Sequence, residues 1–193
     1  MESFRKNFYE IVLSDEWLEK YNQGDSSSAP VYESLLTAFD FHRLSNGELR
    51  LIEVNTNASL FLPILSMYSA TETPVPKGFR PEGFLEAFQR TYRQALSSEL
   101  KKVYIFDEQP DLEGLYFEFL LNKEFFEQNN IQCEIIGTKD LEKIDLNGAL
   151  VYNRHTDFFL EKPELNSLKN HYQNSSAAVS PHPCGYQTMA QKA

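Results

Sequence analysis

The chain is poor in the features that several functional classes depend on. Its 193 residues include 18 Lys and Arg against 28 Asp and Glu, which gives a formal charge of −10 at pH 7. Nucleic acids and anionic membranes are bound through basic surfaces, so this balance argues against both as partners. No apolar run approaches the roughly 18 residues that cross a bilayer, and the charged first residues do not resemble a signal peptide. We therefore expect a soluble, cytoplasmic protein.

Cysteine and the glycine-rich motifs are scarce as well. The two cysteines, Cys133 and Cys184, have no metal-ligand spacing, and we expect a free, buried thiol at Cys133. The sequence has no Gly-x-Gly-x-x-Gly fingerprint, no Walker phosphate loop and no Gly-x-Ser-x-Gly elbow. A stand-alone nucleotide-binding Rossmann protein is disfavoured for this reason, because no glycine-rich phosphate turn follows any strand.

The composition that remains is that of a globular protein, with 41% hydrophobic and 13% aromatic residues. The second half alternates short apolar runs with amphipathic stretches. We predict strands over 102–107, 131–136, 149–153 and 177–180, and helices over 81–100, 111–130, 138–144 and 162–173. Strands separated by helices imply a parallel sheet with right-handed crossovers, whose ligands collect at the carboxyl ends of the strands. The predicted fold class is α/β, with a Rossmann-like parallel sheet flanked by helices.

The first half of the chain has a different pattern of predicted elements. Residues 2–22 have helical periodicity, and a flexible break and a short helix follow them. Two β-type runs around Asn46-Gly47 predict a hairpin over 39–55. A helix limited by Pro63 comes next, and then a loop rich in proline and glycine over 71–83. We place a boundary in this loop, which predicts two domains: 1–80 with the N-terminal helices and hairpin, and 81–193 with the sheet.

The segment Leu51–Leu60, LIEVNTNASL, is the most informative part of the chain. Glu53 and Asn55 stand two positions apart, so they project from one face of a strand at its carboxyl end. Oxygen donors of this kind suit Mg²⁺, and the turn-forming residues that follow offer backbone donors to a carboxylate or phosphate. The alternative is a strand end whose polar residues only cap the next helix.

Polar residues also follow the other predicted strands. Asp107 and Glu108 end one of them, and the run NRHTD over 153–157 follows another. A guanidinium beside an amide and a hydroxyl can bind a carboxylate or phosphate, which makes Arg154 a candidate. The alternative is that Arg154 pairs with Asp157 and fixes the loop. On the helix over 111–130 we expect the aromatic residues to be core and Glu118 to be solvated.

Taken in order, these motifs resemble a known family. LRLIEVNTNAS over 49–59 and LVYNRHTDFFLE over 150–161, followed by the SPHP and MAQK segments, resemble the amino-terminal half of ATP-grasp ligases of the eukaryotic glutathione synthetase type. They also resemble related uncharacterised bacterial ATP-grasp proteins, in which DFH, IEINTNA, IxDExP and YNRxTDF recur in this order. The resemblance spans residues 36–193 and implies a pre-ATP-grasp, substrate-binding domain.

The resemblance also implies roles for individual residues. Glu53 matches a glutamate that contacts Mg²⁺ and ATP, and Asn55 matches an asparagine that binds the metal. The substrate-binding residues of the family fall here on Asn57, Ala58, Ser59, Leu60, Glu108 and Arg154. The family's substrate-facing arginine, however, is replaced here by Ala38, so the resemblance does not imply γ-glutamylcysteine itself as the substrate.

Two hypotheses follow. The first is the substrate-binding part of an ATP- and Mg²⁺-dependent carboxylate–amine ligase that takes a small carboxylate or peptide-like substrate. The nucleotide-binding lobes of such ligases would follow Ala193, so we expect the isolated chain to be inactive. The second is a non-enzymatic module that binds a small anion or a protein on the same scaffold. Because exposed strand edges tend to pair, we also predict that the hairpin forms a homodimer or is covered by the N-terminal helix.

Overall fold

The computed structural model describes residues 35–183 and residue 186. The predicted helix over 2–22 lies outside these residues. The elements in order are β1, β2, α3, α4, β3, α5, β4, β5, α6 and β6, with three short 3-10 turns between them. None of the helices in the described part is long and apolar enough to cross a membrane.

Four parallel strands form the sheet that the sequence predicts. They are β3 (Lys102–Phe106), β4 (Gln132–Ile136), β5 (Leu150–Asn153) and β6 (Ala178–Ser180), in the spatial order β4-β3-β5-β6. The strands are short. β5 and β6 are buried along their whole length, whereas β4, at the edge of the sheet, exposes Gln132 and Glu134. Burial on both faces is typical of a parallel sheet covered by helices. The α/β prediction is therefore confirmed.

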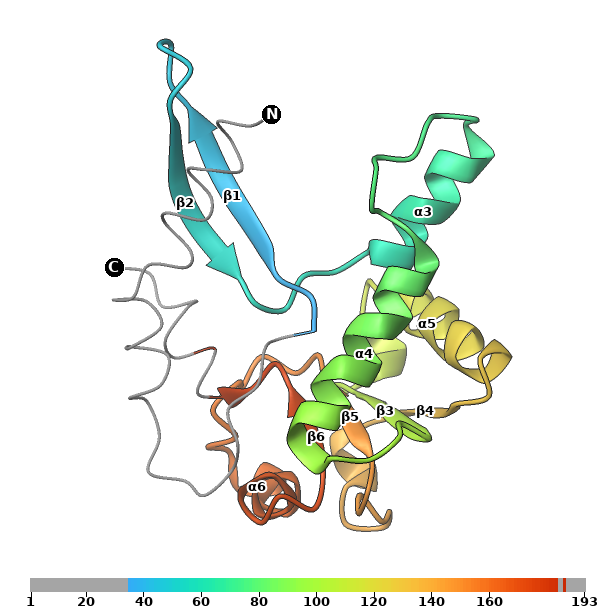
Figure 1. Ribbon diagram of the computed structural model, residues 1–193. Coiled ribbons are helices and arrows are strands. Elements are labelled where there is room, and N and C mark those ends of the chain that lie inside the picture. The colour runs from blue at the N-terminus through green and yellow to red at the C-terminus, as the bar shows by residue number, and fades with distance from the viewer. Residues whose placement is uncertain (1–34, 184–185, 187–193) are drawn as a thin grey trace.

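Helices cover both faces of this sheet (Figure 1). Alternate residues of β3 point to opposite faces, so Val103 and Ile105 belong to one hydrophobic cluster and Tyr104 and Phe106 to another. The first cluster lies under α4 (Pro81–Leu96) and α5 (Tyr116–Gln128), and the second lies under α6 (Asn166–Gln173). Helix α4 begins at Pro81, a residue suited to the first helical position.

The hairpin pairs β1 (Ala38–Arg43) with β2 (Leu49–Asn55) in antiparallel register, as predicted (Figure 1). Its turn contains Gly47 at a φ of 84°, a conformation that glycine adopts without strain. Figure 1 shows the two strands extending away from the sheet. A bulge between Asp40 and Phe41 shifts the register in the middle of β1.

Helix α3 (Phe61–Ala70) follows the hairpin and joins the core of the sheet. Pro63 lies in its first turn, where the missing N–H removes no helical hydrogen bond. Phe61 stacks on Phe84 of α4 at a centroid distance of 5.3 Å, and Leu62 belongs to the same hydrophobic cluster as Phe84. Residues on both sides of the predicted domain boundary thus share one core, and the division at residue 80 stays a prediction.

All four helices predicted in the second half are shorter in the structure, and two of them differ in kind or in where they begin. The helix expected over 138–144 is a single 3-10 turn, Thr138–Asp140, in which Asp140 accepts a hydrogen bond from the backbone N–H of Gly137. The helix expected from residue 111 begins at Tyr116, after a separate turn over Pro110–Leu112 and a break at Gly114. Glycine weakens a helix interior, which accounts for the later start.

Candidate functional site

The direction in which the chain leaves the sheet reverses at the carboxyl ends of β3 and β5. These strands are neighbours, but the chain leaves β3 through α5 toward β4 and leaves β5 through α6 toward β6, on the other side. Because α5 and α6 cover opposite faces of the sheet, the loops after β3 and β5 diverge. Ligands of open α/β sheets bind at such switch points. Glu108 and Arg154 lie in these two loops.

Arg154 is the centre of one group of polar contacts. Its Nη1 donates to the backbone carbonyl of Asn57 at 3.0 Å, to the Asn57 side-chain oxygen and to the carbonyl of Ala58 at 3.3 Å. Its Nη2 donates to the Ser59 hydroxyl. The structure thus brings a guanidinium at the end of β5 against the loop between β2 and α3, more than 90 residues earlier in the chain. Four of the predicted substrate-binding residues lie together here.

Leu60 completes this loop in a strained conformation. Its φ of 66° and ψ of 22° lie in the left-handed region, which costs a residue other than glycine roughly 1–2 kcal/mol. Its backbone N–H donates to Glu118 Oε1 of α5 at 2.7 Å. A short bond to a carboxylate is among the stronger hydrogen bonds in proteins. The loop Asn57–Leu60 is therefore fixed from two sides, by β5 and by α5.

The prediction that Glu118 is solvated is wrong, because only 1% of the residue is exposed. Burial raises the pKa of its carboxyl group, and the bond from Leu60 and the charge of Arg154 act against this rise. Tyr152, also buried, donates its hydroxyl to the Ala58 carbonyl at 3.4 Å, and burial raises its pKa to about 12. Asn122, one turn along α5 from Glu118, is 1% exposed, and neither polar atom of its side chain has a partner in the described part of the chain.

The same loop forms one wall of a pocket of about 430 Å³. Ala58 and Ser59 face this pocket together with Phe61, Phe79 and Phe84. No charged side chain lines it among the described residues. The pocket thus offers an apolar surface beside the Ser59 hydroxyl, which itself contacts Arg154.

Glu108 lies apart from this loop, at a second and larger cleft. Its carboxylate is 3.4 Å from Lys162 Nζ and 3.5 Å from His155 Nε2. His155 is 1% exposed, and its Nδ1 accepts a hydrogen bond from the Asp157 backbone at 2.8 Å, so in the neutral ring the proton is on Nε2 and faces Glu108. Glu108 also lines a cleft of about 740 Å³ at the ends of β3 and β4, whose charged residues are mostly acidic.

Asp157 does not serve as the partner of Arg154 that the alternative interpretation required. Its Oδ2 accepts hydrogen bonds from the backbone N–H groups of Glu161 and Lys162 at 2.8 Å, and its Oδ1 accepts one from Phe159 at 3.2 Å. The carboxylate therefore fixes its own loop. This leaves Arg154 available for the loop after the hairpin.

We expect the Asp157→Ala variant to lose about 2 kcal/mol of unfolding free energy, because three backbone donors lose a charged acceptor and the loop can partly resolvate them. Urea denaturation measures this loss. Thr156→Ala is the matched control, since Thr156 is exposed and adjacent, and it should change the unfolding free energy by less than about 0.5 kcal/mol. Equal effects of the two substitutions would contradict the role of Asp157.

Glu53 and Asn55 lie at the end of β2, at the base of the hairpin. The Asn55 side-chain oxygen accepts a hydrogen bond from the backbone of Asn57 at 2.9 Å, so it also shapes the turn. The described residues contain no group of three or more His, Cys, Asp or Glu side chains that could hold a metal ion. Mg²⁺ is often bound by one or two protein oxygens together with phosphates and water. The two residues therefore fit Mg²⁺ only as part of a site that phosphate oxygens complete.

Neither a comparison with protein-family models nor one with curated protein sequences finds a match to this chain. The structure adds Glu118, His155 and Lys162 to the residues near the candidate site. His155 stands in the NRHTD run that the sequence marks. Glu118 carries no comparable signal, because its partner Leu60 is 58 residues away in the chain.

Proposed function

We propose that this chain is the substrate-binding portion of an ATP-dependent carboxylate–amine ligase resembling glutathione synthetase, with a small carboxylate or peptide-like molecule as substrate. The observation that carries the proposal is the contact of Arg154 with the loop Asn57–Ser59 at the switch point of the sheet. It supports the proposal because residues assigned to substrate binding on sequence grounds come together from two distant segments.

Arg154 has the chemistry to bind a carboxylate at this place. Its Nη2 donates to Ser59 alone, and its Nε is buried without a hydrogen-bond partner, within the part of the chain that the structure describes. Guanidinium groups bind carboxylates through paired N–H donors. A substrate carboxylate would be neutralised by Arg154 and would accept from Ser59, while an apolar part of the same molecule would enter the pocket beside Ala58 and Phe61.

ATP and Mg²⁺ belong to the same proposal. Glu53 and Asn55 would supply the protein oxygens of the metal site. When bound, Mg-ATP would activate the substrate carboxylate as an acyl phosphate that an amine then attacks. Within this chain, Arg154 and Ser59 would hold the carboxylate.

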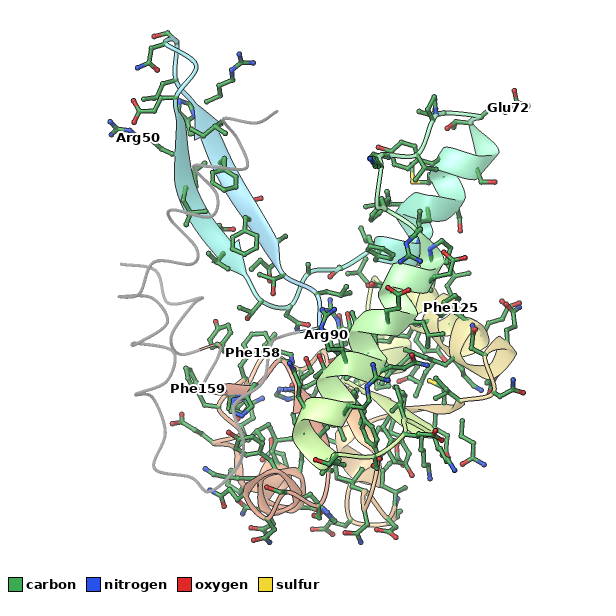
Figure 2. The ribbon with its side chains drawn as sticks, viewed as in Figure 1. Arg50, Glu72, Arg90, Phe125, Phe158 and Phe159 are labelled. Atoms are coloured by element: carbon green, nitrogen blue, oxygen red, sulfur yellow. The ribbon has the colours of Figure 1, made fainter. Side chains whose placement is uncertain are left out.

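The hairpin favours a second candidate, a non-enzymatic module that binds a protein partner. Ile52 of β2 is 64% exposed on a ribbon that extends from the sheet, and Figure 2 shows the side chain of Arg50 farther along the same strand. Exposed strands are places where another chain can pair. Under this second candidate function, we still predict a homodimer that forms through the hairpin.

Ligand binding tests the first candidate directly. We expect dipeptides with a free carboxylate to shift the NMR signals of the Ser59 amide and the Arg154 Nε–H, and the same dipeptides with amidated C-termini to leave them unchanged. The amidated series controls for ionic strength and for the peptide body. If neither series shifts these signals, the carboxylate site does not exist.

We also expect no phosphate release from Mg-ATP by this chain with any such substrate, because the sequence contains no glycine-rich loop to cover nucleotide phosphates. Robust turnover in the same solutions would contradict the proposed division of labour, in which this portion binds substrate without transferring phosphate.

A further inference from the structure

Glu118 is a buried carboxylate that the proposed function leaves without an assigned task. It lies on α5, a different element from Arg154, and it contacts the loop Asn57–Leu60 at the opposite end. Arg154 holds the carbonyl groups of Asn57 and Ala58, and Glu118 holds the N–H of Leu60. The two contacts have opposite charges and opposite hydrogen-bonding roles.

The conformation of Leu60 shows why two contacts are needed. Leucine does not favour a positive φ, so this residue stays left-handed only where its surroundings fix it. In the structure its own N–H donates a hydrogen bond to Glu118, and the hydroxyl of the preceding residue, Ser59, accepts one from Arg154. Ser59 also lines the pocket that the proposed function assigns to the substrate.

We propose that Glu118 is a positioning residue, which together with Arg154 clamps the strained loop Asn57–Leu60 and so sets the shape of the substrate pocket. This inference rests on the proposed function for its meaning, but the clamp itself is a property of the chain without ligand. A ligand carboxylate that draws Arg154 away from Ser59 would relax one side of the clamp. Substrate binding and the conformation of Leu60 would then be coupled.

The clamp depends on the ionised form of Glu118. Among the described residues, the titratable and charged groups that act on this carboxylate are Tyr152 of β5 and Arg154, which directly follows β5. Burial raises the pKa of Glu118 and the charge of Arg154 lowers it. As the pH falls through that pKa, the carboxyl becomes neutral, its bond to the Leu60 N–H weakens, and the loop loosens.

NMR of the ¹⁵N-labelled wild-type chain tests the clamp. We expect the Leu60 amide signal to titrate with a midpoint above the 4.5 of an ordinary glutamate. The midpoint should rise further in Arg154→Lys, where the delocalised fork that faces the loop is replaced by a mobile ammonium. In Glu118→Gln the titration should disappear, and exchange of the Leu60 amide hydrogen should become about tenfold faster or more.

Glu124→Gln provides the matched control, because Glu124 lies on the same helix and is exposed. It should leave the Leu60 titration unchanged. A Leu60 amide that does not titrate in the wild-type chain, or that titrates equally in Glu118→Gln, would overturn the inference. The wild-type titration needs no variant, so it decides the matter even if Glu118→Gln folds poorly.

The two proposals fail in different ways. If the amide titrates as expected but no carboxylate dipeptide shifts it, the clamp exists and the proposed substrate is wrong. If carboxylate dipeptides bind and the amide does not titrate, the substrate site stands and Glu118 does not position it.

Discussion

Replacing Phe88 by alanine is expected to destabilise the chain by about 3–5 kcal/mol, the usual cost of removing a buried phenylalanine. Phe88 is 0% exposed, and its ring contacts Phe84 and Phe126 at centroid distances of 4.8 Å and Tyr152 at 5.3 Å. It therefore joins α4, α5 and β5. For a chain of this size the loss corresponds to a fall in Tm of roughly 10 °C, which calorimetry measures.

The same substitution should also affect the candidate site. The hydroxyl of Tyr152 accepts a hydrogen bond from Arg154 at 3.3 Å, so a cavity beside the Tyr152 ring loosens one support of the guanidinium. Phe117→Ala is the matched control, because Phe117 is 48% exposed on α5. It should cost less than about 1 kcal/mol. Similar losses in both variants would mean that the aromatic cluster is not the core of this fold.

Much of the fold could be predicted because its signals are local. The Asn46-Gly47 turn predicts the hairpin, and the spacing of Phe84, Phe88 and Tyr92 predicts the buried face of α4. The order of the strands could not be predicted in this way. The exposed Gln132 and Glu134 are typical of an edge strand and fit the place of β4, but nothing in the composition of the other three strands distinguishes β3–β5 pairing from any other. The position of the switch point follows only from long-range pairing.

The candidate site, like the fold, could be predicted only in part from the sequence. Arg154 stands out in the sequence, because polar residues after a strand mark the edge where ligands bind. Asn57 and Ser59 are indicated by the resemblance to ATP-grasp ligases. Glu118 does not stand out, because a glutamate among helical aromatics is usually solvated. Its carboxylate accepts a hydrogen bond from the N–H of Leu60, the N-cap residue of α3, which adopts a positive φ. A conformation of that kind cannot be read from a leucine in the sequence.

Replacing Arg154 by glutamine is expected to cost about 3 kcal/mol of unfolding free energy, measured by urea denaturation at pH 7. The guanidinium donates hydrogen bonds to Asn57, Ala58, Ser59 and Tyr152. A glutamine amide cannot reach all four acceptors at once. Arg154→Lys keeps the charge without the planar fork, so its loss should be intermediate. Arg50→Gln is the matched control, since Arg50 lies on the exposed hairpin (Figure 2) and forms an ion pair with Glu48 at the surface. It should change the unfolding free energy by less than about 0.5 kcal/mol.

The pH dependence of the Arg154→Gln loss separates an electrostatic clamp from simple packing. The pKa of Glu118 is raised in the folded chain, so the unfolded chain ionises first and stability falls as the pH rises from 4.5 through the folded pKa. The charge of Arg154 limits that rise, and removing it moves the folded pKa higher. The difference between wild type and Arg154→Gln should therefore be smaller at pH 4 than at pH 7. A difference independent of pH would mean that Arg154 stabilises the loop Asn57–Leu60 without sensing the charge of Glu118.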